Sequence, residues 1–341
     1  MSTERYHRQM LIPDIGDDGQ SRLRQSCVLV VGCGALGSVA ADLLVRAGVG
    51  HVRLVDRDIV ELTNLQRQVL YDETDIGTPK ATAARDRLRA VNSDVDIQAV
   101  IDDVDADTIR SLAAGCDLII DGLDNFETRY LINDFSVSTG TPWIYGGAIG
   151  TTGMSTTVLP DDTPCLRCLF PDPPAAGTTP TCETAGVLGP VIHRVAAHQI
   201  TQAIKLLTGN TAAVDRTLQT FDVWSNVQHA MAPGSRRDDC PCCGRRDFEW
   251  LDGHRTPSTM VLCGRDAVQI KPGRHHTDVP LQELADRLAI HGSFRCTADV
   301  LQGRFADEDI ELTVFSNGRA LVKGSRSPEH ARSVYARYIG T

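Results

Sequence analysis

A glycine-rich turn near the N-terminus places the strongest constraint on the fold. Gly32, Gly34 and Gly37 fit the pattern G-x-G-x-x-G. They follow the apolar run 27–31 and open the helical pattern 34–46. The first glycine of such a turn allows a tight bend, the second lets phosphate approach the backbone, and the third allows close helix–strand packing. The turn predicts a nucleotide-binding α/β fold, with a turn that serves packing alone as the alternative.

An acidic residue follows at the spacing that a nucleotide site requires. Asp56 ends the next apolar run, 19 residues after Gly37 (56 − 37). A carboxylate there can accept hydrogen bonds from ribose hydroxyls. The pattern does not choose between NAD, FAD and ATP, so other residues must decide.

Short β-branched runs alternate with helical patterns through the first half of the chain, which is typical of a parallel α/β sheet. We expect strands at 27–31, 51–55, 94–100, 117–121, 142–146, 154–159 and 218–224, and a long helix at 187–207. Residues 172–181 are rich in proline, glycine and threonine, which predicts an irregular loop. The expected fold class is α/β, with a doubly wound, Rossmann-like, mostly parallel sheet.

The length of 341 residues and a change of pattern near Pro257 suggest two domains, 1–255 and 256–341. The second is expected to be a small α+β module. It should contain a strand at 260–270, an amphipathic helix at 279–291, a hairpin around Asn317-Gly318 and a last helix at 327–339.

Charge and hydropathy exclude several classes of protein. The net charge is −10, from 34 basic and 44 acidic residues, which argues against binding to the nucleic-acid backbone. No apolar run approaches 18 residues, and the N-terminus is polar, so neither a membrane span nor a signal peptide is expected. We therefore expect a cytoplasmic protein.

Basic residues near the glycine turn favour ATP over a dinucleotide. Asn64 and Arg67 stand in the segment Asn-Leu-Gln-Arg-Gln, Lys80 follows closely, and Arg8 lies near the N-terminus. Such cations suit a triphosphate and its pyrophosphate leaving group. Asp124 follows the fourth strand, at the sheet edge where α/β folds bind ligands, and its carboxylate can hold Mg²⁺. Taken singly, each cation reads as a surface charge and Asp124 as a helix cap.

The cysteines include two pairs at metal-binding spacing. Cys165 and Cys168 form one C-x-x-C pair, and Cys240 and Cys243 form another. Four thiolates predict a closed tetrahedral Zn²⁺ site that stabilises the fold and has no open position for catalysis. Free thiols or a redox pair are the alternative, and Cys242 could compete as a ligand.

The ordered set R-Y-x-R-Q, G-x-G-x-x-G, D, N-L-Q-R-Q, K and D-N resembles the MoeB/ThiF/HesA family, prokaryotic relatives of ubiquitin-activating enzymes. The resemblance covers about residues 4–250. It implies a homodimeric adenylyltransferase that joins AMP from ATP to the C-terminal glycine of a ubiquitin-like sulfur-carrier protein ending in Gly-Gly. The family has a four-cysteine site at matching positions, which supports zinc.

The resemblance also implies a role for each matching residue. Gly32, Gly34 and Gly37 would line the nucleotide site, and Asp56 would bind ribose. Asn64, Arg67 and Lys80 would bind the phosphates. Asp124 would be the Mg²⁺-linked acid, and Arg8 would be the arginine lent to the partner subunit.

Cys182, in the context T-C-x-x-A-G-V, is similar to the family cysteine that receives the activated carrier as a thioester or acyl persulfide. The alternative is that adenylylation suffices and Cys182 is dispensable. The C-terminal module resembles the tail of some members and lacks a rhodanese pattern.

Other functions remain as alternatives. An NAD- or FAD-dependent oxidoreductase would need hydride-handling residues that the sequence does not display, and a zinc-stabilised scaffold would show no ATP-dependent exchange. The sequence does not choose between thiamine, molybdopterin, tRNA thiolation and protein tagging.

Overall fold

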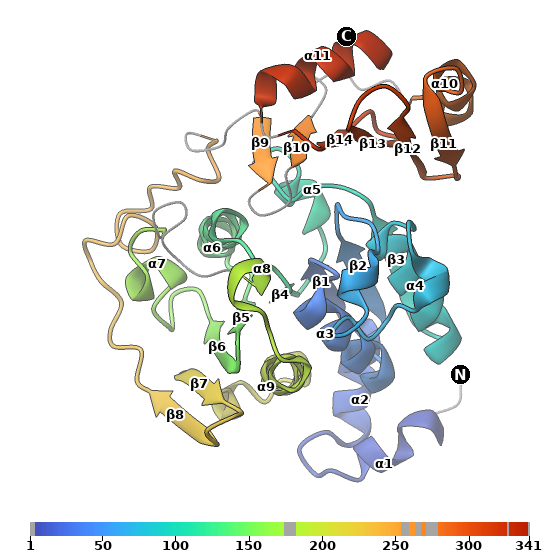
Figure 1. Cartoon of the computed structure of the whole chain (residues 1–341). Helices are drawn as coiled ribbons and strands as arrows, with labels where there is room; N and C mark the ends of the chain where they lie inside the picture. Colours follow the sequence, from blue (N-terminus) through green and yellow to red (C-terminus); the bar gives the residue numbers. More distant parts are fainter. Residues whose placement is uncertain are drawn as a thin grey trace. The chain divides into compact units, whose positions relative to one another are not determined.

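A computed structural model describes residues 4–173, 182–253, 259–262, 267–270, 279–325 and 327–339, with the backbone alone at 182, 183 and 259–262. The chain divides into two compact units, Met1–Thr256 and Pro257–Thr341 (Figure 1). Each unit has its own sheet and its own hydrophobic core. No helix among the described residues is both long enough and apolar enough to cross a membrane.

The first unit is built on an eight-stranded sheet of order β3-β2-β1-β4-β5-β6-β7-β8. The strands are β1 Cys27–Val31, β2 His51–Val55, β3 Asp96–Val100, β4 Leu118–Asp121, β5 Trp143–Ile149, β6 Thr152–Val158, β7 Leu218–Asp222 and β8 Val227–Met231. The pairs from β3 to β5 are parallel, and those from β5 to β8 are antiparallel. Strand order reverses between β1 and β4, the switch point of a doubly wound sheet. This topology confirms the expected fold class.

Helices connect and cover the strands of this sheet. They are α1 His7–Met10, α2 Gly16–Gln25, α3 Ala35–Ala47, α4 Lys80–Val91, α5 Ile109–Leu112, α6 Phe126–Thr139, α7 Leu166–Leu169, α8 Cys182–Ala185 and α9 Gly189–Leu207. Single 3₁₀ turns are η1 Glu4–Tyr6, η2 Leu62–Asn64, η3 Glu73–Asp75 and η4 Thr211–Ala213. The long helix expected at 187–207 is therefore confirmed as α9.

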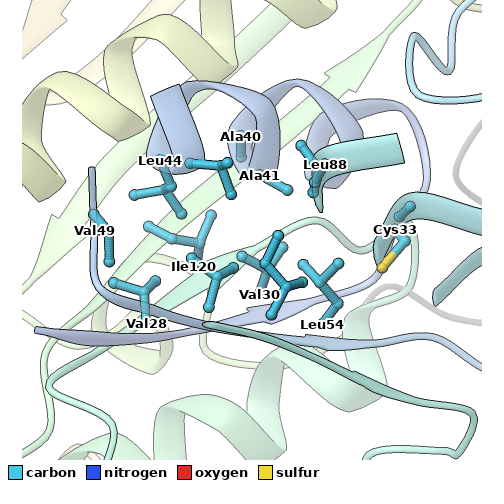
Figure 2. Packing of buried hydrophobic residues seen from close by; sticks show 14 of the residues in the cluster. Val28, Val30, Cys33, Ala40, Ala41, Leu44, Val49, Leu54, Leu88 and Ile120 are labelled. Atoms are coloured by element: carbon cyan, nitrogen blue, oxygen red, sulfur yellow. The ribbon is translucent and has the colours of Figure 1, made fainter. Parts of the chain in front are cut away.

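The central strands are apolar throughout because both faces of the sheet are covered. Val28 and Val30 of β1 point into a core shared with Leu44 of α3 and Leu88 of α4 (Figure 2). The alternate residues of the same strand point into a second core, which contains Tyr130 of α6 and other residues of α5 and α6. Successive side chains of a strand point to opposite faces, so a continuous apolar run is what a covered strand needs.

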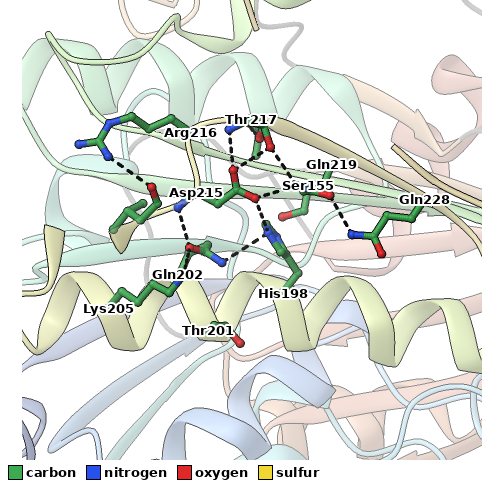
Figure 3. A network of polar contacts seen from close by, with 12 residues as sticks. Ser155, His198, Thr201, Gln202, Lys205, Asp215, Arg216, Thr217, Gln219 and Gln228 are labelled. Atoms are coloured by element: carbon green, nitrogen blue, oxygen red, sulfur yellow. Dashed lines mark hydrogen bonds and ion pairs between the residues drawn. The ribbon is translucent and has the colours of Figure 1, made fainter. Parts of the chain in front are cut away.

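A polar network lies between α9 and β7 (Figure 3). Asp215 accepts hydrogen bonds from the amide of Thr217 and the side chain of Gln219, each at 2.8 Å, and lies 3.3 Å from Nε2 of His198. Burial is the main cause that lowers the pKa of His198, and it outweighs the opposing effect of the Asp215 carboxylate. His198 is therefore neutral in the folded chain at neutral pH.

The second unit has a six-stranded antiparallel sheet of order β11-β12-β13-β14-β10-β9. Its elements are β9 Thr259–Leu262, β10 Ala267–Ile270, α10 Leu281–Leu288, β11 Gly292–Cys296, β12 Val300–Phe305, β13 Glu311–Phe315, β14 Ala320–Lys323 and α11 Pro328–Tyr338. The hairpin expected around Asn317-Gly318 is confirmed, with Gly318 in the left-handed region at φ 79°.

Some sequence expectations need correction. The single strand expected at 260–270 is two antiparallel strands, β9 and β10. The strands β8, β11 and β12 were not expected. Every residue of β8 is exposed, so no alternation of buried and exposed residues marks it. β11 alternates but has no fully buried residue, and β12 contains Gln302, Gly303 and Arg304. The loop expected at 172–181 falls largely on residues 174–181, which lie outside the described part of the chain.

Candidate nucleotide site and four-cysteine cluster

The three glycines of the turn have different reasons to be glycine. Gly32 has a φ of 88°, in the left-handed region. A Cβ on Gly37, or on Gly122 after β4, would collide with the carbonyl oxygen of Gly32. A Cβ on Gly34 would meet nothing closer than 3.8 Å. Backbone conformation and packing therefore account for the first and third glycines, whereas the half-buried second glycine has room for a Cβ, so packing does not explain it.

Asp56 is held against this turn by the backbone. Its carboxylate accepts hydrogen bonds from the amide of Cys33 at 2.6 Å and from the amide of Asp58 at 2.7 Å. Burial raises the pKa of Asp56, although the nearby Lys80 ammonium opposes that rise. The sequence-predicted carboxylate thus lies beside the glycine turn, at the carboxyl end of β2.

Lys80 begins α4 and is 3% exposed. Its Nζ lies 3.4 Å from a carboxylate oxygen of Asp58. The hydroxyl of Tyr71 donates to the carbonyl oxygen of Cys33 at 2.7 Å and lies 3.2 Å from the backbone carbonyl oxygen of Lys80. Tyr71 therefore connects the glycine turn with the start of α4. A buried ammonium group therefore lies at the same edge of the sheet as Asp56.

Asp124 is exposed after β4 and belongs to the same group of charges. Arg57 lies 3.9 Å from Asp58, the partner of Lys80. Burial lowers the pKa of the Arg57 guanidinium, but nearby carboxylates outweigh that effect and raise it. Asp103 contributes most among these carboxylates, and Asp124 contributes as well. Lys80 and Asp124 are thus linked through Asp58 and Arg57 along the carboxyl ends of the parallel strands.

Arg129 of α6 fixes the turn that carries Asp124, and sequence reasoning missed it. Its Nε lies 2.9 Å from the buried carboxylate of Asp121. Its Nη2 donates to the carbonyl oxygens of Leu123 at 2.6 Å and Gly146 at 2.7 Å. The one signal available was an aspartate that ends an apolar strand, and such an aspartate has no unique partner in sequence. Arg57, Asp58 and Gln68 were also missed, because their neighbours Asp103, Lys80 and Gly34 lie in segments distant in the sequence.

The segment 64–68 approaches the turn through a residue other than the predicted ones. Asn64 is buried, and its Oδ1 accepts from the amide of Glu61, so it builds the local turn. Arg67 is half-buried and donates to the carbonyl oxygen of Thr63 at 2.8 Å. Gln68 is buried beside Gly34, and its Oε1 has no hydrogen-bond partner among the described residues.

Arg8 lies away from the nucleotide turn of its own chain. It is exposed on α1, and its neighbour Gln9 donates to the carbonyl oxygen of Ala47 at the last residue of α3. Gly34 is the N-cap at the other end of that helix, whose first residue is Ala35. A helix of 13 residues is about 20 Å long, so Arg8 and Gly34 are at opposite ends.

Cys182 begins the short helix α8, and its side chain lies outside what the structure describes. The segment after α8 is fixed to the β5–β6 turn, where Gly150 and Gly186 share a backbone hydrogen bond of 2.8 Å. The first residue of α9, Gly189, faces the carbonyl oxygen of Gln66. The connection that carries Cys182 therefore leads to the segment 64–68.

The four predicted metal ligands come together. The sulfur atoms of Cys165, Cys168, Cys240 and Cys243 all lie within 4.8 Å of one another. Three of the separations are 3.3, 3.7 and 4.0 Å. A tetrahedron with zinc–sulfur bonds of about 2.3 Å has edges of about 3.8 Å. The cluster could therefore hold zinc.

Cys242 is not one of these ligands. Its sulfur accepts a hydrogen bond from Nδ2 of Asn133, on α6, at 3.2 Å. Oδ1 of the same asparagine accepts from the amide of Leu166, between the first two ligands. Asn133 thus connects both cysteine-bearing segments to α6, and Cys242 belongs to that connection.

Comparison with known proteins places this arrangement in context. A model of the ThiF family matches residues 6–242. The sulfur carrier protein ThiS adenylyltransferase of Bacillus subtilis (strain 168) is 41% identical over 341 residues, which cover 99% of this chain and 100% of that protein. The SAMP-activating enzyme E1 of Haloferax volcanii is 42% identical over 249 residues, covering 73% of this chain and 92% of that protein.

Solved structures share the fold. A crystal structure of E. coli MccB with ATP superposes with a TM-score of 0.62 at 22% identity, covering 71% of this chain and 75% of that one. The family match extends over more than half of the chain, and the Bacillus relative aligns along almost all of it. This protein belongs to the ThiF family.

Proposed function

We propose that this protein transfers AMP from ATP to the C-terminal glycine carboxylate of a ubiquitin-like sulfur-carrier protein that ends in Gly-Gly. The observation that carries the proposal is that Asp56 is held against the glycine turn by the amide of Cys33, with Lys80 and Asp124 linked to the same sheet edge through Asp58 and Arg57. Two relatives named as acting on sulfur carriers or SAMP, at 41% and 42% identity, support the choice of substrate.

The residues present fit ATP. Gly34 caps α3 without a side-chain hydrogen bond, and the positive end of a helix dipole favours a phosphate. Asp56 presents a carboxylate suited to ribose hydroxyls. Gln68 adds a buried amide oxygen with no partner among the described residues.

Charge compensation is the main task of the protein side chains. The carrier carboxylate and the α-phosphate are both anionic, so they repel each other as they approach. Lys80 and Arg67 would offset that repulsion, and one such electrostatic contribution is typically worth about 3–4 kcal/mol of barrier. Asp124 would hold the Mg²⁺ that accompanies the phosphates.

The site would be completed by a second copy of the chain. Arg8 is at the far end of α3 from its own glycine turn, so we propose that it serves the nucleotide site of a partner in a homodimer. Mixing Arg8→Ala with Asp124→Ala protein tests this. In an equal mixture with free subunit exchange, about half of the dimers are hybrids, and one of the two sites in each hybrid has both native residues. Activity should therefore recover to about a quarter of the wild-type value. If Arg8 acts in its own subunit, the mixture stays inactive.

The remaining features have supporting roles. Cys182 would attack the acyl carbon of the carrier adenylate, release AMP and hold the carrier as a thioester. If a persulfide donor has first passed its sulfane sulfur to Cys182 and left as a thiol, the same attack by the Cys182 persulfide gives an acyl persulfide. The four-cysteine cluster would bind structural Zn²⁺. The C-terminal module, from residue 256, would position the carrier or stabilise the enzyme, and the setting would be the cytoplasm.

The direct test combines the protein, ATP, Mg²⁺ and candidate Gly-Gly carriers, and follows carrier–AMP by mass together with pyrophosphate exchange. Arg67→Ala and Asp124→Ala should largely abolish carrier-dependent exchange. Arg89→Ala, an exposed residue in the last turn of α4, is the matched control and should exchange normally. Near-normal exchange in both of the first two variants would remove the proposed roles. The carrier that forms the adenylate identifies the pathway, and a reducible adduct that Cys182→Ser lacks identifies the covalent step.

A further inference from the structure

We propose that Cys27 and Cys116 form a redox-active dithiol that closes reversibly to a disulfide by exchange with low-molecular-weight disulfides. The two sulfur atoms are 3.1 Å apart, although the residues are 89 positions apart in sequence. Cys27 begins β1, and Cys116 precedes β4, the neighbouring strand. Both cysteines are half-buried, so a small reagent can reach them.

The backbone around the pair is already in place for closure. The amide of Asp117 donates to the carbonyl oxygen of Cys27 at 2.8 Å. The amide of Cys27 donates to the Asp117 carboxylate, also at 2.8 Å. Cys116 is the next residue along the chain, so its sulfur is held beside Cys27 by these two hydrogen bonds. A disulfide needs the sulfurs at about 2.0 Å, which requires an approach of about 1 Å.

The electrostatic environment gives the two thiols different roles. The hydrogen bond with Cys116 is the main cause that lowers the pKa of Cys27 to about 7, and the positive charges of Arg53 and His51 contribute. Nη1 of Arg53 lies 3.5 Å from the sulfur of Cys116. The same hydrogen bond raises the pKa of Cys116, and the negative charge of Asp117 opposes ionisation of both thiols. We assign Cys27 as the nucleophile and Cys116 as the resolving thiol because their shared hydrogen bond lowers the pKa of Cys27, although the Arg53 charge also favours the Cys116 thiolate.

The exchange balances with a small disulfide as the oxidant. The Cys27 thiolate attacks one sulfur of the reagent, forms a mixed disulfide and expels the first small thiolate. Cys116 then loses its proton, and its sulfur attacks the Cys27 sulfur and expels the second small thiolate. Two protein thiols are oxidised by two electrons in total, and the small disulfide is reduced to two thiols.

This pair is separate from both sites described above. It lies at the amino ends of β1 and β4, whereas the glycine turn and Asp124 follow their carboxyl ends. Five residues of strand span about 16 Å, so the dithiol is about that far from the turn. The closed form would join the two strands that carry the nucleotide site, without touching the site itself.

The experiment uses full-length, zinc-loaded protein in glutathione redox buffers, quenched with acid, alkylated, digested and analysed by mass spectrometry. We expect a Cys27–Cys116 linked peptide that dithiothreitol removes, with unchanged zinc content. Cys116→Ser should accumulate a mixed glutathione disulfide at Cys27, whereas Cys27→Ser should form little adduct at Cys116. Cys296→Ser, in the second unit, is the control and should form the linked peptide as wild type does.

A measurement on the wild-type protein keeps the proposal testable if the variants fold poorly. Alkylation of Cys27 should follow pH with a midpoint near 7, not the ordinary value of 9.0. At pH 7, about half of Cys27 would be thiolate, against about 1% for a thiol with a pKa of 9.0. Because a thiolate of lower pKa is a weaker nucleophile, the alkylation rate of Cys27 should exceed that of such a thiol by only about six-fold. Absence of the linked peptide in excess oxidised glutathione would overturn the proposal, and a midpoint near 9 would overturn the assignment of Cys27 as the nucleophile.

Discussion

Replacement of Lys80 by methionine tests whether the buried ammonium group holds the nucleotide site together. The side chains of Lys80 and Asp58 are 4% and 15% exposed, and their charged atoms are 3.4 Å apart. With an effective dielectric constant of about 20, the attraction at this distance is about 5 kcal/mol. Removing one partner of a buried pair typically costs about 3–5 kcal/mol, because the other charge stays buried. We expect Lys80→Met to lower the free energy of unfolding of the first unit by about 3 kcal/mol.

Urea unfolding followed by tryptophan fluorescence is the suitable assay. All three tryptophans, Trp143, Trp224 and Trp250, lie in the first unit, so the signal reports that unit alone. A double-mutant cycle with Asp58→Asn should give a coupling energy of about 1–3 kcal/mol. A coupling below about 0.5 kcal/mol would show that the pair contributes little, and that the ammonium group is held by its other neighbours.

Three further predictions concern the cysteine cluster, the buried histidine and the glycine turn. Cys243→Ser should lose bound zinc in a metal analysis whereas Cys242→Ala should keep it; equal loss in both would refute the ligand assignment. Acidification below pH 6.5 should lower the free energy of unfolding in urea titrations. His198 takes up a proton there in the unfolded chain, but in the folded chain its lowered pKa keeps it neutral until a lower pH. His198→Gln should flatten that dependence, and an unchanged slope would exclude the histidine. Gly37→Ala should destabilise the first unit by about 1–3 kcal/mol, whereas Gly34→Ala should fold normally and bind ATP more weakly in calorimetry.

The predictability of the fold depended on how strongly burial marks the sequence. The strand 27–31 is apolar at every position because two cores flank it, and the hairpin at Asn317-Gly318 needs the left-handed backbone that glycine supplies. The strand β8 has no such mark, since all five of its residues are exposed. Its formation depends on backbone pairing with β7, which leaves no pattern of side chains to recognise.

The site was predictable where chemistry fixes spacing. The glycine turn and the two C-x-x-C pairs must keep their internal distances, so they are visible in sequence. Arg129 reaches Asp121 and Gly146 across the sheet, and Gln68 reaches Gly34 from a distant segment. Contacts of this kind depend on strand order, which no local pattern encodes.

The charges at the sheet edge bear on the proposed homodimer. Asp56, Asp58 and Asp124 present three carboxylates close to the turn, and the cations linked to them are Lys80 and Arg57. Burial is the main cause that raises the pKa of Asp56, and the negative charge of the neighbouring Asp58 adds to that rise, so the local charges already repel another anion. A nucleotide triphosphate would bind there only with added positive charge. Under the proposed function, Mg²⁺ at Asp124 would supply part of it, and in the proposed homodimer Arg8 of a second copy would supply more, which would account for the distance of about 20 Å between Arg8 and its own turn.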